Sequence, residues 1–222
     1  PVSIVNAGTA TTLSMPDWFE ALDWMRTNTK ENSVIAAWWD YGYWITVMGD
    51  RISLADNATV NSTRIALLGE MYLSNQTTSL SILKSMGADY VVVFVAGQRL
   101  EVQGYSQYVL GAGGDESKMQ WFMRISGLPV DQFLHADNTP KPFFWENTFL
   151  GKLFPFTLTQ YIDQEGKLAG DEYKEGYIPL YSYNMKFPSE SDGTVRLAFE
   201  SSSLKKNEAG LLAGVLIYEI VT

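Results

Sequence analysis

The chain has 222 residues, which is enough for one compact domain with its own hydrophobic core, or for one domain with a smaller appendage. It contains no cysteine and one histidine, so disulfides, cysteine-bound zinc, iron–sulfur clusters, thiol nucleophiles and His-rich metal sites are excluded, and a Ser–His hydrolase is disfavoured. The net charge of −9 argues against nucleic acid as a partner, because an acidic surface repels phosphate.

Two apolar runs, residues 90–96 and 211–221, are both shorter than the roughly 18–20 residues of a membrane-spanning helix. No basic segment precedes an apolar stretch, so we expect no signal peptide. The chain begins with proline rather than methionine, which suggests a fragment or a processed product. We therefore expect a soluble piece of a longer protein.

The first predicted element is a helix that begins near Ser14 and ends near Thr29. A capping hydroxyl, an early proline and an acidic residue are typical of a helix start. Apolar residues then follow at i, i+4 and i+7, which predicts one buried face made of Trp18, Leu22 and Met25.

Two strands are predicted in the first half of the chain. Residues 34–38 indicate a short buried strand that continues into a turn-like cluster at residues 40–42. Residues 90–95 are apolar and β-branched throughout, which is typical of a strand covered on both faces in a parallel sheet.

Three further helices are expected between and after these strands. Residues 65–72 carry helical periodicity, and a second helix should start at the hydroxyl cluster of residues 77–79 and end at Gly87. A third should run from Asp115 to about Ser126, after a glycine-rich loop. The first half is therefore predicted to be α/β.

The last third of the chain predicts antiparallel strands. Residues 129–151 indicate an ordered connection, and strands follow at residues 177–187, 194–202 and 211–221. We expect a mixed α/β (α+β) fold, in which residues 1–150 form the central α/β core and residues 151–222 form an antiparallel β-rich extension packed on that core.

The densest chemical cluster is residues 38–40. Two adjacent tryptophans can converge on one small object only if the backbone turns between them, and Asp40 and Gly42 favour a turn. Two indole N–H donors and one carboxylate acceptor match the hydrogen-bonding capacity of a single hydroxyl group. The cluster is therefore a candidate pocket for one hydroxyl; the simpler interpretation is that both rings fill the core and Asp40 caps a turn.

This cluster resembles the signature of the catalytic subunit of oligosaccharyltransferase, in its archaeal type, the membrane enzyme of asparagine-linked glycosylation. The matching residues are Trp38-Trp39-Asp40-Tyr41-Gly42. A second family motif, Asp-x-x-Lys-x-x-x-Met/Ile, is matched in register by Asp115 and Lys118, while Phe122 stands where the family has Met or Ile. The intervening segments 55–65 and 88–93 also look like the family's.

The second motif has its own physical logic. Positions 115, 118 and 122 share one face of a helix. Asp115 follows two glycines, so a role as helix N-cap is open beside a direct role in binding. Lys118 would stand in the first turn, where the helix dipole disfavours a cation, and this favours a functional reason for it.

The resemblance implies that the whole enzyme transfers an oligosaccharide from a lipid-linked donor to the asparagine of an acceptor polypeptide with the sequence Asn-x-Ser/Thr. It also implies that the divalent metal, Mn or Mg, and the catalytic acids lie in the membrane part. On this basis we expect no metal site and no catalytic residue in this fragment, which alone would be inactive. The expected location is the extracytoplasmic face of the membrane.

The domain's expected role is recognition of the Ser/Thr two residues after the acceptor Asn. Trp38, Trp39 and Asp40 would bind that hydroxyl, and Lys118 and Phe122 would close the pocket, with Tyr41, Gly42 and Asp115 supporting the motif. A site built for a hydroxyl rejects its absence, because each buried polar group left unpaired costs about 1–3 kcal/mol.

Three sequons of the chain's own begin at Asn57, Asn61 and Asn75, and we weigh glycosylation evenly against chance and helix capping. The alternative function is an aromatic-rich carbohydrate-binding module, which the 14% of aromatic and 18% of charged residues would fit. A free-standing glycosidase would need two facing carboxylates, and the sequence shows no recognisable pair.

Overall fold

A computed structural model describes residues 16–191, 193–206 and 208–221. Residues 16–28 are helical. The elements that follow in chain order are β1 (Val34–Ala36), η1 (Trp39–Tyr41), α2 (Gly42–Val47), β2 (Ile52–Ser53), α3 (Ser62–Leu73), α4 (Gln76–Ser85), β3 (Tyr90–Val102), β4 (Tyr105–Leu110), η2 (Asp115–Ser117), α5 (Met119–Ser126), α6 (Val130–Phe133), α7 (Pro142–Asn147), α8 (Phe149–Leu153), β5 (Phe156–Ile162), β6 (Leu168–Gly170), β7 (Ile178–Tyr183), β8 (Val195–Glu200), α9 (Ser202–Lys205) and β9 (Gly210–Ile220).

The described strands form one nine-stranded sheet, ordered β2-β1-β3-β4-β7-β5-β6, with β9 pairing on β3 and β8 on β9. The fold is mixed α+β, as predicted. Strand β3 is the central strand, because β9 pairs with it over ten positions, from Tyr90 to Arg99. One sheet therefore contains strands from both sides of the expected boundary at residue 150, and the division into core and extension stays a prediction.

The prediction of a parallel sheet around residues 90–95 was only partly right. Strand β3 is parallel only to β1, and it is antiparallel to both β4 and β9. Its apolar run is nevertheless buried, as a strand with both faces covered requires: residues 91–96 are all buried. A continuous apolar run reports burial on two faces and leaves the direction of the neighbouring strands open.

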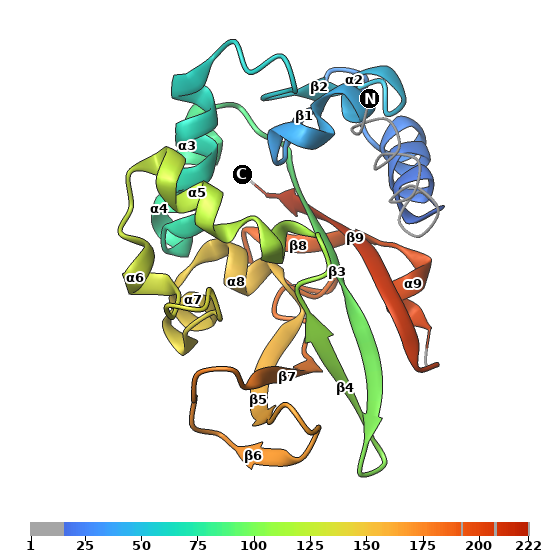
Figure 1. Cartoon of the computed structure of the whole chain (residues 1–222). Helices are drawn as coiled ribbons and strands as arrows, with labels where there is room; N and C mark the ends of the chain where they lie inside the picture. Colours follow the sequence, from blue (N-terminus) through green and yellow to red (C-terminus); the bar gives the residue numbers. More distant parts are fainter. Residues whose placement is uncertain (1–15, 192, 207, 222) are drawn as a thin grey trace, which may run out of the picture.

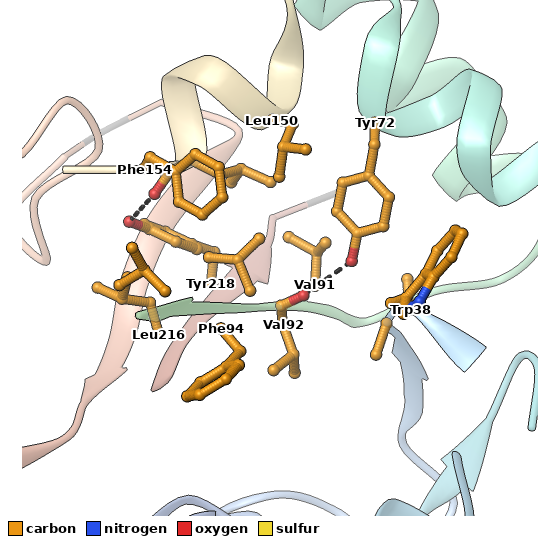
Figure 2. Packing of buried hydrophobic residues seen from close by; sticks show 14 of the residues in the cluster. Trp38, Tyr72, Val91, Val92, Phe94, Leu150, Phe154, Leu216 and Tyr218 are labelled. Carbon is orange, nitrogen blue, oxygen red and sulfur yellow. Dashed lines mark hydrogen bonds between the residues drawn. The ribbon is translucent and has the colours of Figure 1, made fainter. Parts of the chain in front are cut away.

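Helices cover both faces of the central strands. In Figure 1, α3, α4 and α5 lie on one side of β3 and the helix of residues 16–28 lies on the other. Figure 2 shows that Tyr72, Leu150 and Phe154 lie on one side of β3 and Phe94 on the opposite side. On that opposite side, the ring of Trp18 lies 5.8 Å from that of Phe94.

The predicted helices are largely confirmed. The helix of residues 16–28 buries Trp18, Leu22 and Met25, while its expected cap at Ser14 lies outside the described residues. Helix α4 begins earlier than expected, because the side chain of Asn75 caps it and accepts a hydrogen bond from the backbone N–H of Thr78. The hydroxyl cluster 77–79 therefore lies inside the helix.

The strands of the last third are confirmed as β7, β8 and β9, and two more were missed. Strand β5 carries the alternation Phe-Thr-Leu-Thr-Gln-Tyr, in which buried and exposed residues alternate at its start, so a signal of period two was present. The connection at residues 129–151 contains the short helices α6 and α7 and most of α8. Among the described residues, no helix has the length and apolar character that a membrane crossing needs.

Candidate functional site

The two adjacent tryptophans are brought together by a change of backbone conformation directly after β1. Trp38 is extended, with φ −58° and ψ 140°, and the 3₁₀ turn η1 starts at the next residue. The backbone N–H of Tyr41 donates to the carbonyl oxygen of Trp38 at 3.1 Å. The rings of Trp38 and Trp39 consequently lie 3.5 Å apart between centroids, where a continuing strand would have placed them on opposite faces. The predicted backbone turn is confirmed.

The two rings differ in exposure. Trp38 is only 2% exposed, and Phe122, at 0%, packs edge-on against it with ring centroids 4.0 Å apart. Trp39 is half-buried and packs on the outside of this pair. Neither indole nitrogen donates a hydrogen bond to another described residue. The buried polar side-chain atoms without a partner in the described part of the chain belong to other residues, His135 and Trp145. Phe122 therefore supports the tryptophans from within the core and is not itself at the surface.

A chain of polar contacts links the two sequence motifs. The Lys118 ammonium lies 2.9 Å from a carboxylate oxygen of Asp40 and donates to the Tyr41 hydroxyl at 2.8 Å. The Tyr41 hydroxyl in turn donates to Asp115 at 2.7 Å. Burial raises the pKa of Tyr41 well above its usual value, and the Asp115 charge adds to this, so the phenol keeps the proton that it donates. Residues 77 positions apart are thus fixed against each other.

Asp115 is held rigidly because strand β3 has a gap in its edge pairing. Strand β1 pairs with β3 at residues 90–91, and β4 pairs with the same edge only from Gly97 onward. In the gap, the fully buried Asp115 carboxylate accepts a hydrogen bond from the backbone N–H of Phe94 at 2.9 Å. Glu116, 5% exposed, accepts one from the N–H of Ala96 at 3.2 Å. Two side chains of η2 therefore do what a neighbouring strand would do.

Both acids are buried at a cost. Burial raises the pKa of Asp115 above its usual value, although the nearby Lys118 charge lowers it in part. Burial raises the pKa of Glu116 to about 7, and the backbone N–H groups that it accepts from offset only part of this. The sequence analysis did not single out Glu116. Its position directly beside Asp115, in a segment with few other charges, could have indicated that it belongs to the same site.

Gly42 has a different role from the one predicted. Its backbone is helical, with φ −58°, so no turn conformation demands a glycine here. A Cβ at this position would lie 2.2 Å from the carbonyl oxygen of Ala55, so glycine is required by close packing against the segment that follows β2. In that segment Asn57, with its amide nitrogen turned inward, donates to the carbonyl oxygens of Trp39 and Asp40 at 3.2 and 3.1 Å. The sequence marks Asn57 only as the start of a sequon, and its role in supporting residues 39 and 40 was not predicted.

The predicted helix from Asp115 to Ser126 is broken. Residues 115–117 form η2, Lys118 lies at the junction, and α5 begins at Met119. Asp115 is not an N-cap, because its carboxylate bonds to β3 and Tyr41 rather than to the start of a helix. Lys118 and Phe122 still approach the tryptophan–aspartate cluster, Lys118 through Asp40 and Phe122 through Trp38.

The sequon asparagines have structural roles that the sequence left open. Asn61 caps α3 and Asn75 caps α4, each through its side-chain oxygen. Whether any of the three carries a glycan stays open. Among the described residues no group of three or more His, Asp or Glu side chains gathers in a way that could hold a metal ion.

Comparisons with known proteins give consistent matches. Residues 31–96 match the family model described as the STT3/PglB/AglB core domain. Over 111 residues, half of this chain, the sequence is 43% identical to the dolichyl-diphosphooligosaccharide–protein glycosyltransferase subunit STT3 of Saccharomyces cerevisiae. Over 136 residues, or 61% of the chain, it is 36% identical to the corresponding subunit of Schizosaccharomyces pombe.

This chain spans only 14% and 16% of the length of those two proteins. Among solved structures, the C-terminal globular domain of an oligosaccharyltransferase from Archaeoglobus fulgidus aligns with 92% of this chain and 96% of its own, at 19% identity and a TM-score of 0.49. Both of these sequence relatives are eukaryotic, so the archaeal type suggested by the motif stays a prediction.

Proposed function

We propose, on the premise that this chain carries the core domain of the STT3/PglB/AglB family, that it is the C-terminal globular domain of an oligosaccharyltransferase that acts in N-linked protein glycosylation. Within that enzyme, the surface formed by Trp39, Asp40 and Lys118 recognises the Ser or Thr hydroxyl two residues after the acceptor asparagine. The bond chemistry, the lipid-linked oligosaccharide and the divalent metal belong to the part of the enzyme outside this chain, and the domain faces the extracytoplasmic side of the membrane.

One observation carries this proposal: the Asp40–Lys118 contact joins the two motifs. Lys118 occupies one oxygen of the Asp40 carboxylate, and the side chain of Asp40 stays 43% exposed. A carboxylate has about four acceptor sites, so Asp40 retains capacity for an incoming O–H donor. Lys118 is fixed by Tyr41 and Asp115, and it therefore holds the carboxylate in one orientation before the peptide arrives.

The tryptophans supply the complementary donors. A hydroxyl that donates to Asp40 has two lone pairs left, and we expect the indole N–H groups of Trp38 and Trp39, the two residues at the start of η1, to donate to them. Because Trp38 and Phe122 are almost fully buried, the apolar contact with a threonine methyl falls to the outer ring, Trp39. That contact is worth about 0.8 kcal/mol, so threonine acceptors should be preferred to serine acceptors by a few-fold.

The test is acceptor selectivity in the full-length enzyme. Asp40→Ala should lower glycosylation of an Asn-x-Thr peptide by at least about a hundredfold, because it removes a charge-assisted hydrogen bond and leaves Lys118 without its partner. The same variant should lose the wild-type discrimination between Asn-x-Thr and Asn-x-Val peptides. Glu70→Ala, an exposed acid on α3, is the matched control and should leave both quantities unchanged. Wild-type activity and selectivity in the Asp40 variant would contradict the proposal.

A carbohydrate-binding module remains the alternative. Stacking on a sugar ring needs aromatic rings grouped on one surface. The exposed aromatic side chains of the described residues come from six different elements: Phe19 from the helix of residues 16–28, Tyr43 from α2, Tyr105 from β4, Trp121 from α5, Phe143 from α7 and Tyr183 from β7. Robust binding of free glycans by the chain on a glycan array would favour this alternative.

A further inference from the structure

A cavity of about 610 Å³ opens between α7, α8, β5 and the segment after β7. Its walls include the apolar side chains of Trp145, Leu158 and Phe187 and the ammonium-bearing side chains of Lys152 and Lys186. It shares no residue with the site around Asp40 and Lys118. We call it the Lys186 cavity.

The ammonium of Lys186 is held by hydrogen bonds to backbone oxygens, which do not neutralise its charge. Its ammonium donates to the carbonyl oxygens of Gly151 and Phe156, both at 2.7 Å, which ties the end of α8 to the start of β5. An ammonium has three N–H donors, and the third has no acceptor among the described residues. The same group lies 5.7 Å from the centre of the Trp145 ring.

Neither lysine of the cavity has a carboxylate within ion-pair distance in the described part of the chain. The ion pairs found there involve Lys118, Lys167 and two arginines. Burial, followed by the positive charge of Lys152, lowers the pKa of Lys186 to about 8. No acid offsets this shift, so the cavity holds two like charges, of which one is largely removed from water.

Two acids also line the cavity and limit the charge of its ligand. Glu146 and Asp171 are both exposed. Neither carboxylate lies within ion-pair distance of the Lys186 ammonium. A ligand with a second negative charge would meet them, whereas a single charge can pair with Lys186 and Lys152.

We propose that the Lys186 cavity binds a small organic anion with one negative charge, such as a carboxylate, on an apolar or aromatic body. The anion accepts the third N–H of Lys186 and is stabilised by Lys152. The body packs between Trp145, Leu158 and Phe187. The cavity volume is within the range of small-molecule sites, which are mostly apolar with a few well-placed polar groups.

The test is a titration of the 222-residue chain, followed through the amide and indole N–H signals around Trp145. Benzoate supplies the charge and the ring; benzamide keeps the ring without the charge, and acetate keeps the charge without the ring. Benzoate should bind saturably, with a roughly millimolar Kd typical of a fragment of this size. Benzamide and acetate should each bind at least about tenfold more weakly, and isophthalate, with two charges, more weakly than benzoate.

Variants assign the binding to the two lysines. Lys186→Gln and Lys152→Gln should each weaken benzoate about tenfold, since each removes a charge from the anion's surroundings. Lys167→Gln, on an exposed turn, is the matched control and should change nothing. If Lys186→Gln fails to fold, Lys152→Gln decides, because the Lys152 ammonium makes no hydrogen bond to another described residue.

Three results would overturn the proposal. These are the absence of saturable shifts around Trp145, equal binding of benzoate and benzamide, and unchanged benzoate affinity in the Lys152 variant. Each would leave the function proposed for Asp40 and Lys118 untouched, because the two sites share no residue.

Discussion

Two partly buried lysines show how differently two regions of this protein treat the same charge. Lys118, at the junction of η2 and α5, contacts the carboxylate of Asp40, the hydroxyl of Tyr41 and, at 3.9 Å, the carboxylate of Asp115. Lys186, after β7, contacts two backbone carbonyl oxygens, and the positive charge of Lys152 adds to the burial that lowers its pKa. The first ammonium is part of a network with carboxylates, and the second has no counter-ion in the part of the chain that the structure describes.

The two lysines differ in whether their surroundings are complete without a ligand. The Lys118 ammonium donates to the Tyr41 hydroxyl, and that hydroxyl donates to the Asp115 carboxylate. The same carboxylate accepts from a backbone N–H of β3, which fixes the whole network to the sheet. Such a network orients an exposed group, Asp40, without needing a ligand. Around Lys186 the electrostatic balance is incomplete, which is why we infer a ligand there. The predictions below test each half of this contrast.

The largest expected effect concerns the acid at the end of the Lys118 network. Asp115→Ala should lower the free energy of unfolding by about 3 kcal/mol or more, because it leaves the N–H of Phe94 and the hydroxyl of Tyr41 buried without an acceptor. Urea unfolding followed by tryptophan fluorescence measures this. Asp131→Ala, an exposed acid on α6, should cost no more than about 1 kcal/mol. A loss in the Asp115 variant no larger than that of the control would show that the network does not stabilise the fold.

The second prediction concerns the close packing that holds η1 in place. Gly42→Ala should cost about 2 kcal/mol, because the added Cβ would overlap the carbonyl oxygen of Ala55 and force the backbone apart. Gly193→Ala is the control, since its Cβ would approach only the end of the Ser191 side chain, at 3.2 Å. Thermal unfolding of the two variants side by side gives the comparison. Equal stability would mean that the segment after β2 moves freely away from η1.

The third prediction is a pH dependence on the motif side. Glu116 has a pKa of about 7 in the folded chain and an ordinary one near 4.5 when unfolded, so between these values the folded state binds more protons. Stability from this group is present at low pH and is lost as the pH rises through 7, by an amount on the order of 2 kcal/mol. The difference in unfolding free energy between wild type and Glu116→Gln should follow this course from pH 4.5 to 7.5. A flat difference would contradict the buried state of this carboxyl.

The smallest expected effect is the mirror image at the cavity. The pKa of Lys186 is about 8 in the folded chain, below its usual 10.5, so between these values the unfolded state binds more protons. Wild type should therefore gain stability relative to Lys186→Met as the pH rises from 8 to 10.5, by about 1 kcal/mol after allowance for partial exposure. Unfolding of both proteins across this range tests the sign. A gain in the opposite direction would indicate a counter-ion beside Lys186 and would weaken the contrast with Lys118.

Local features of this fold were predictable because their causes are local. The face of Trp18, Leu22 and Met25 repeats within two turns of one helix, and the β-branched run at residues 90–95 reports burial by composition alone. The residues that cap helices were harder to predict. Both Asn75 and the hydroxyl cluster 77–79 could cap the start of α4, and the sequence does not show which of them does. The antiparallel pairing of the strand at residues 90–95 was not predicted, because its partner, β9, lies more than a hundred residues away in the chain.

The candidate site divides in the same way. The residue types in the two motifs were evident from the sequence, and so was the need for a backbone turn between the tryptophans. The roles of Gly42 and Asp115 were not, because each depends on a distant segment: Gly42 on the carbonyl oxygen of Ala55, and Asp115 on the unpaired edge of β3. The contacts of Glu116 and Asn57 were missed for the same reason, since nothing in their immediate neighbours indicates what they bind.

The sequence by itself determined the longer helices and strands, such as α3, α4, β3 and β9, together with the absence of thiol chemistry and the set of donors and acceptors at residues 38–40. The tertiary structure alone decided that Lys118 meets Asp40, that Phe122 packs against Trp38, and that Lys186 meets no carboxylate among the described residues. Secondary structure follows from contacts within a few residues, which a periodic pattern records. Contacts between side chains 77 positions apart follow from how β3 pairs along its two edges, and from where it leaves a gap in which side chains, among them those of Asp115 and Glu116, bond to its backbone.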